Sequence, residues 1–360
     1  MNISPELEHA ITVRIIQEDA ETIYSLLKSE RNPIFGMEII PYYALFVQSF
    51  QEYVGETLVS NEIAPRIKDI RNHIKNYTDS FGKSKRKISK TDDIQDAEFK
   101  SQLRFDFMKS WNIHLNLGTY WTSDGYIVGN TQQIADYLDI TTFDKTVGKR
   151  QFDLAYQISS FVSSVRSGME EKLSPPNMQR KHYSVDIPCY FDLNTRRNSK
   201  FFTENNSKDL NLFYLHLLCN MNFVKHILRW LLPDENTWLF RIEYIVTYYA
   251  YRALERLKNY CENNKDIHID IKSVDQILIG GVSLFESKFR NCMMHYDLQN
   301  HDVLSAEYIE CHFYGLVETC FNGISYHEYM CNLRKMSDSI INFLERQINT
   351  SAARLEHFDN

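Results

Sequence analysis

The sequence predicts an all-α protein, and three features of the chain support this fold class. Apolar residues recur every three to four positions over long segments, as in helices that bury one face. Glycine and proline are scarce, at 12 and 8 of 360 residues, so tight turns should be few. Long helices with short connections favour antiparallel packing. We therefore expect helical bundles, including a four- to five-helix bundle in the C-terminal part.

The first half of the chain is expected to form a mostly helical domain over residues 1–166. Helical periodicity covers residues 5–29, 40–58, 62–77, 94–114 and 148–167, with Gly- and Asp-containing breaks between them. The exception is segment 123–130, where Ser-Asp-Gly precedes several β-forming residues. This pattern predicts a short hairpin or an extended loop.

The periodicity stops near Ser167 and resumes near Lys208. Residues 167–206 contain Ser-Pro-Pro and an Asn-rich stretch, which indicate a linker or an irregular insertion. Strong helical patterns then cover residues 207–232, 236–263, 273–297, 304–321 and 326–349, so we predict a second helical domain over residues 207–350. No repeat of about 20–50 residues is visible, which disfavours solenoid architectures.

Composition and charge argue against several classes of protein. A net charge of −7 disfavours a protein that coats nucleic acid non-specifically, although it is compatible with a local groove lined by basic residues. Seven cysteines without a Cys-x-x-Cys pair indicate reduced thiols and no structural zinc. The N-terminus is acidic where a secretion signal is basic, and the apolar tract 210–232 contains Lys225 and Arg229, which a bilayer would penalise. We expect a cytoplasmic protein with no membrane contact, no metal and no cofactor.

The segment Phe289-Arg290-Asn291-Cys292-Met293-Met294-His295-Tyr296 is the strongest candidate for chemistry. It places an arginine, an asparagine and a histidine near the end of the helix predicted over residues 273–297. The chain has four Arg-Asn pairs, and only the pair at Arg290 has a histidine five positions after the arginine. On an ideal helix Arg290 and His295 lie ~140° apart, so they would flank a groove with Asn291 between them.

Arg290 and His295 form an Arg-x4-His pattern that resembles the Arg-x4-6-His signature of the HEPN superfamily. These domains are all-helical and include many metal-independent ribonucleases. The resemblance covers at most residues 207–350 and implies a HEPN-like bundle that acts on RNA as a homodimer. One branch of the superfamily has a tyrosine two positions after the histidine, whereas Tyr296 follows His295 directly. The resemblance therefore does not imply a tyrosine modification in this chain.

RNA carries its own nucleophile, the ribose 2′-hydroxyl, so cleavage needs a base, an acid and a cation but no metal. A histidine titrates near pH ~6.5 and can transfer protons at neutral pH, which is the role predicted for His295. Arg290 can donate two parallel hydrogen bonds to phosphate oxygens, and Asn291 would position the phosphate or the histidine. The residues predicted to contact RNA are Ser287, Lys288, Tyr296 and Arg71.

A second segment, Ile70-Arg71-Asn72-His73-Ile74-Lys75-Asn76-Tyr77, parallels the first, with Asn76 at the position of the histidine. HEPN domains usually build their cleft from two facing bundles. The parallel therefore predicts that the first half is a degenerate HEPN-like copy, which would make an internal pseudo-dimer with one intact and one damaged half-site. The alternative is that Arg-Asn pairs end helices for capping and dipole reasons alone.

The main functional prediction is a metal-independent endoribonuclease that cleaves RNA by 2′-hydroxyl attack. The resemblance also implies a toxin or phage-defence effector, with an antitoxin protein as a further partner. The main alternative is a non-catalytic HEPN-like dimer module that binds RNA, a nucleotide or a protein. A third class is a purely structural dimer, in which Arg290 and His295 lie on an ordinary exposed face.

Three other features have weaker functional interpretations. His295, Asp297, His301 and Asp302 suggest a metal site, but the further ligands that a His-Asp phosphohydrolase needs are not identifiable. The basic run at 83–90 predicts a solvated loop, or else a contact with an RNA backbone. His114, between two tryptophans, is expected to be a core histidine.

Overall fold

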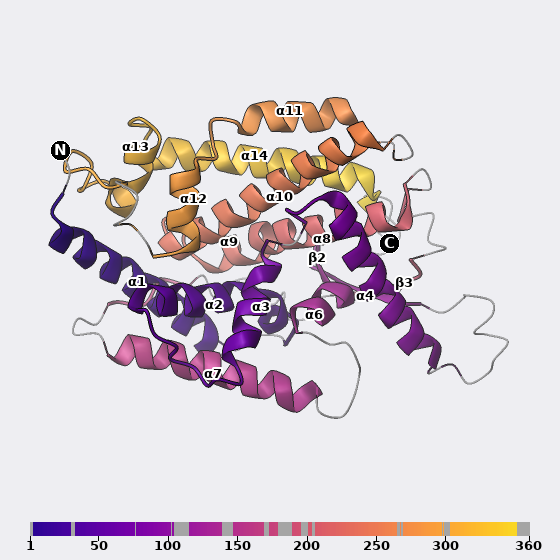
Figure 1. Ribbon diagram of the computed structural model, residues 1–360, viewed down its shortest axis with the longest axis horizontal. Helices are drawn as coiled ribbons and strands as arrows, with labels where there is room; N and C mark the ends of the chain where they lie inside the picture. The colour runs from indigo at the N-terminus through magenta and orange to yellow at the C-terminus, as the bar shows by residue number, and fades with distance from the viewer. Residues whose placement is uncertain are drawn as a thin grey trace.

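A computed structural model describes residues 3–29, 33–75, 77–101, 103, 115–138, 147–168, 173–178, 189–195, 201–203, 206–264, 267, 269–296, 298 and 303–350. It is mostly helical, as the sequence predicts, with one small three-stranded sheet. In Figure 1, α10, α11, α12 and α14 of the second half lie above α1, α2, α3 and α7 of the first half.

The helices of the first half begin at α1 (Pro5–Lys28), where the Ser4 hydroxyl accepts a hydrogen bond from the Leu7 amide. The others are α2 (Pro33–Val54), α3 (Ala64–His73), α4 (Phe81–Ser101), α6 (Thr131–Tyr137) and α7 (Val147–Ser167). Helix α4 begins well before the predicted start at residue 94, because the basic run at 83–90 is helical and is not the predicted loop. Most of the rest of the predicted helix 94–114 lies outside the described residues.

The sheet contains β1 (Leu117–Trp121), β2 (Ile127–Asn130) and β3 (Cys189–Leu193), in the order β2-β1-β3 with antiparallel pairing. The hairpin of β1 and β2 confirms the turn predicted at 123–130, and its turn contains Gly125 at φ 78°. Strand β3 lies inside the segment 167–206, which was expected to be irregular. The prediction missed this strand because its pairing partner is distant in the sequence.

The helices of the second half begin with α8 (Lys208–Phe223), which continues through a π-helical turn (Val224–Leu228) into α9 (Arg229–Leu231). The others are α10 (Thr237–Asn263), α11 (Ile271–Gly281), α12 (Ser287–Met294), a 3₁₀ turn (His312–Gly315), α13 (Leu316–Cys320) and α14 (Tyr326–Gln347). Side chains of Ser207, Asn236 and Ser325 cap α8, α10 and α14.

The single helix predicted over residues 273–297 is wrong, because the chain turns between α11 and α12. Gly281 lies so close to Tyr251 that a Cβ at this position would be 2.3 Å from its ring. In the turn that follows, the Leu284 carbonyl accepts a hydrogen bond from the Tyr329 hydroxyl at 2.6 Å. Val282, in this turn, is 75% exposed. Because of this turn, α12 does not continue the direction of α11. The direction of α12 in turn determines where Arg290 and His295 lie.

The two predicted domains share one hydrophobic core. Helix α8 packs against β2 and α4 of the first half, and α10 packs against α1 and α4. The largest buried side chains come from both parts of the chain, among them Phe46, Phe81, Trp238 and Phe289. Surfaces of the first half therefore meet surfaces of the second half directly, including the ends of α3 and α12.

Candidate functional site

His295 is the first residue after α12 and has an extended backbone conformation (φ −140°, ψ 155°). Two contacts hold the end of the helix in place. The Ser49 hydroxyl of α2 donates a buried hydrogen bond to the Met294 carbonyl at 2.7 Å, and the His295 amide bonds to the Asn291 carbonyl at 2.8 Å. The imidazole points away from the core with 31% of its side chain exposed, so a ligand can reach it.

Glu52 of α2 orients the imidazole of His295. Its Oε2 lies 2.6 Å from His295 Nδ1, and its Oε1 accepts a hydrogen bond from the Gln48 amide at 2.9 Å. The hydrogen bond from His295 is the largest cause that lowers the pKa of Glu52 to about 2, with Gln48 and the charges of His295 and Arg71 also contributing. An ionised carboxylate can only accept, so Nδ1 carries the proton.

Arg71 of α3 lies on the other side of the same imidazole. Its Nη2 is 3.3 Å from His295 Nε2, and its side chain is buried with only 6% of the residue exposed. A guanidinium can only donate, so Nε2 is the nitrogen that accepts in this contact. This nitrogen is the one that a general base would use. The two segments that are parallel in the sequence therefore meet at one histidine.

Two further cations, Arg290 and Lys75, interact electrostatically with the residues that contact this histidine. Desolvation lowers the pKa of Lys75 to about 8, and the positive charges of Arg71 and Arg290 add to this effect while Glu52 opposes it. Burial raises the pKa of Tyr249 in α10 to about 12, and the positive charges of the same two arginines oppose this rise. Within the described part of the chain, the buried Nε atoms of Arg71 and Arg290 have no hydrogen-bond partner.

The remaining predicted site residues fall into two groups. Asn291 and Ser287 share a face of α12 with Arg290, where Asn291 is partly buried and Ser287 is exposed. Lys288 is exposed but lies ~200° around the helix from Arg290, and its charge acts on Cys320 of α13. Lys288 therefore lies outside the cluster.

Tyr296 has a structural role that conflicts with the predicted contact to RNA. Only 3% of the residue is exposed, and its hydroxyl donates a hydrogen bond to Asp19 at 2.7 Å. Asp19 also pairs with Arg241 at 3.2 Å, and the guanidinium of Arg241 lies over the Tyr296 ring. This buried network anchors the residue next to His295 and so limits how far the imidazole can move.

Three further features of the sequence were candidates for function: the basic run at 83–90, a possible metal site and His114. Three lysines of the basic run in α4 pair with carboxylates: Lys83 with Asp79 at 3.8 Å, Lys85 with Asp209 at 4.0 Å and Lys87 with Asp136 at 2.9 Å. Among the residues that the structure describes, no group of His, Cys, Asp and Glu side chains could hold a metal ion. His114, Asp297, His301 and Asp302 lie outside the described residues.

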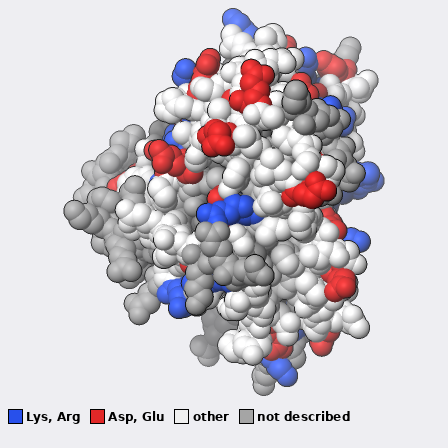
Figure 2. Space-filling view, turned by 90° about the vertical axis from the view of Figure 1, so that its left-hand side faces the viewer, with Lys and Arg blue, Asp and Glu red and all other residues white. Residues whose placement is uncertain are grey.

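One face of the molecule carries charged side chains of both signs. On the face drawn in Figure 2, Lys and Arg side chains alternate with Asp and Glu, and no broad basic patch covers the described residues.

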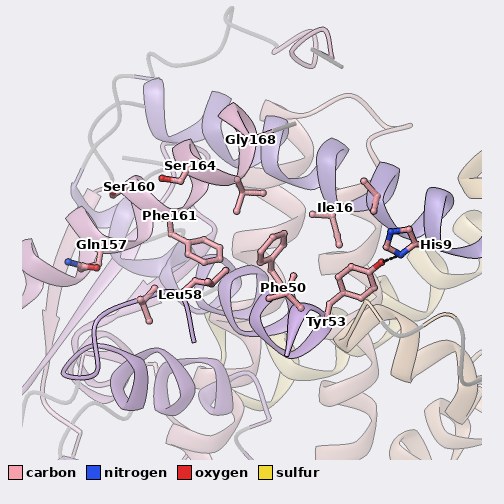
Figure 3. A pocket seen from close by; sticks show the side chains of 14 residues that line it. His9, Ile16, Phe50, Tyr53, Leu58, Gln157, Ser160, Phe161, Ser164 and Gly168 are labelled. Atoms are coloured by element: carbon pink, nitrogen blue, oxygen red, sulfur yellow. Dashed lines mark hydrogen bonds between the residues drawn. The ribbon is translucent and has the colours of Figure 1, made fainter. Parts of the chain in front are cut away.

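A pocket of about 660 Å³ lies between α1, α2 and α7, on the Tyr53 side of the helix that carries Glu52. Phe50 and Phe161 pack edge to face in its wall, and His9 Nδ1 and the Tyr53 hydroxyl lie 2.5 Å apart at one end (Figure 3). Sequence reasoning gave no indication of this pocket, because it is formed by three segments that are separate in the chain.

Comparison of the chain with protein-family models, curated proteins and solved structures found no significant match. Of the helices in the described part of the chain, none combines the length and the apolar character needed to cross a membrane.

Proposed function

We propose that this protein is a metal-independent endoribonuclease of the HEPN type, with one active site built within a single chain. The observation that carries the proposal is the contact of Arg71 with His295 Nε2, while Glu52 holds Nδ1. The charges of Arg71, Arg290 and Glu52 also act on Lys75, which adds a further cation to this group of residues. A half-buried set of cations beside an accepting imidazole is the arrangement that a scissile phosphate and its 2′-hydroxyl need.

In the proposed reaction, the 2′-oxygen of RNA attacks phosphorus while His295 Nε2 takes its proton. The new O2′–P bond forms as the P–O5′ bond breaks, which leaves a 2′,3′-cyclic phosphate and a 5′-hydroxyl. Arg290 holds the charge that develops on the non-bridging oxygens. Arg71 contacts Nε2 in the free protein, and the incoming phosphate would draw its guanidinium away and free the base.

Under this proposal, catalysis does not depend on the predicted homodimer. In a site shared by two protomers, the second arginine would come from the partner, whereas here Arg71 of the same chain supplies it. A homodimer through the second half remains a prediction, but it is not needed to complete the cluster. The role of a toxin or phage-defence effector with an antitoxin partner likewise remains part of the proposal.

The test is cleavage of mixed cellular RNA and tRNA by purified protein in the presence of EDTA. Wild type should release fragments that end in 2′,3′-cyclic phosphate, and His295→Ala and Arg290→Ala should not. Arg256→Ala, which removes an exposed arginine of α10, is the matched control and should cleave like wild type. Circular dichroism and thermal melting would show that each variant is folded.

The non-catalytic alternative predicts a different pattern in the same experiment. RNA would stay intact in every lane, while a labelled oligonucleotide would still bind and would lose affinity in Arg290→Ala. Intact RNA without such binding would instead indicate a purely structural dimer.

A further inference from the structure

Lys75 lies on the turn that follows α3, four residues after Arg71, and its backbone is fixed at both ends. Its amide donates to the Asn72 carbonyl at 3.0 Å, and its carbonyl accepts from the Thr78 amide at 3.2 Å and from the Thr78 hydroxyl at 2.8 Å. Tyr77, which follows at φ 73°, is buried with its hydroxyl 2.6 Å from His216 Nδ1. The turn therefore holds Lys75 in one place.

The surroundings of Lys75 differ from those of the lysines in α4. It is partly buried, and the charged groups that face it are Arg71 of α3, Arg290 of α12 and Glu52 of α2. Within the described residues, no carboxylate forms an ion pair with it, whereas Lys87 of α4 lies 2.9 Å from Asp136. A partly buried ammonium that forms no ion pair in the described residues, and on which the charges of two arginines act, is expected to bind an anion.

We infer that Lys75 is the general acid of the site and gives its proton to the 5′-oxygen as the P–O5′ bond breaks. The inference rests on the proposed ribonuclease function and adds a catalytic residue to it. His295 Nε2 takes the proton of the 2′-hydroxyl, so a second group must protonate the leaving oxygen. Lys75 is the ammonium that the fold brings to the same cluster from the parallel segment, one residue before the position where that segment has Asn76.

The chemistry of the ammonium fits this role. Desolvation, aided by the charges of Arg71 and Arg290, lowers the pKa of Lys75 to about 8. Lys75 is then mostly protonated at neutral pH, yet it gives up its proton far more readily than an ordinary lysine does. After the reaction, the neutral amine would regain a proton from water, and protonated His295 would lose one.

A substrate with sulfur in place of the 5′-bridging oxygen tests the inference, because a thiolate leaves without protonation. On ordinary RNA at pH 7, Lys75→Ala should cleave about 100-fold more slowly than wild type. On the 5′-thio substrate, the same variant should cleave within a few-fold of wild type, whereas Arg290→Ala should be impaired on both substrates. Lys75→Arg keeps the charge but holds its proton, so it should stay slow on ordinary RNA. Lys335→Ala, an exposed lysine of α14, is the control.

The pH profile adds a second readout. The rate of wild type on ordinary RNA should fall as the pH rises past about 8, and this fall should be absent on the 5′-thio substrate. An equal loss in Lys75→Ala on both substrates would overturn the inference and leave Lys75 as a binding residue. Wild-type rates in Lys75→Ala would overturn it as well. If wild type cleaves neither substrate, it is the proposed function that fails.

Discussion

The end of α3 and the end of α12 have the same order of residue types but different surroundings. Each has a buried apolar residue before Arg-Asn, Ile70 or Phe289, and each ends in a buried tyrosine. The hydroxyl of Tyr77 contacts His216, and that of Tyr296 contacts Asp19. The arginines differ, because Arg71 is buried against His295 whereas Arg290 is partly exposed.

This difference suggests a division of labour between two similar segments. The α12 segment would supply the base and the arginine that reaches the phosphate. The α3 segment, which has no histidine at the matching position, would supply an arginine that positions the base and the proposed acid. A pseudo-symmetric pair of this kind needs only one histidine, provided that another group takes over the second proton transfer.

The largest effect is expected from removal of the base. His295→Ala should lower the rate of RNA cleavage by about 10³-fold, since proton transfer by a positioned side chain contributes on the order of 10²–10⁴-fold. Single-turnover kinetics with excess protein would measure it. His73→Ala, the histidine of the other segment, should stay within a few-fold of wild type, and an equal loss in both variants would contradict the asymmetry.

The two arginines should differ in the size and the kind of their effect. Arg290→Lys should slow cleavage about 100-fold, because an ammonium cannot make two parallel bonds to a phosphate. Arg71→Lys should cost about tenfold, since a single donor can still reach His295 Nε2. Rates at saturating RNA would compare them directly. The reverse order would show that Arg71 is the phosphate ligand.

Glu52→Gln should slow cleavage about tenfold, because an amide holds the Nδ1 proton less firmly than a carboxylate does. Its effect on stability should depend on pH. The folded pKa of Glu52 is lowered to about 2 from its ordinary value of 4.5, so the carboxylate stabilises the fold above pH 4.5. That stability is lost as the pH falls from 4.5 towards about 2. The unfolding free energies of wild type and Glu52→Gln should converge over this range, and a constant gap would contradict the assignment.

The smallest effects are expected from the two tyrosines that end the segments. Tyr296→Phe removes a hydrogen bond to a charged group and should lower the free energy of unfolding by about 2 kcal/mol. Tyr77→Phe removes a bond to a neutral partner and should lower it by about 1 kcal/mol. Urea unfolding monitored by fluorescence would measure both. Equal losses would show that the Asp19 network adds nothing to the anchoring of α12.

The sequence predicted the parts of this molecule that depend on local patterns. Helices α1, α7, α10 and α14 follow from apolar periodicity and from caps such as Ser4, and the hairpin follows from its Asp-Gly turn. The break before α12 was missed because periodicity continued through it, although the Gly280-Gly281 pair was a visible signal. The helical start of α4 was missed because its lysines resembled a solvated run.

The site was predicted only in part, for a physical reason. Arg290, Asn291 and His295 lie within one motif, and Arg71 was found through the parallel between the two segments. Glu52 has no local signal, since it meets His295 across 243 positions of the chain. Lys75 was visible in the second segment, but the charges of Glu52 and Arg290 act on it only when α2, α3 and α12 come together.

The central claim is that one chain builds the whole site, and mixing two inactive variants tests it most directly. Arg71→Ala and His295→Ala would be combined in equal amounts, unfolded together, refolded and assayed on RNA in EDTA. A site within one chain predicts no cleavage above the sum of the two variants alone. A rise well above that sum would contradict the account, because it would require Arg71 of one chain to serve His295 of another.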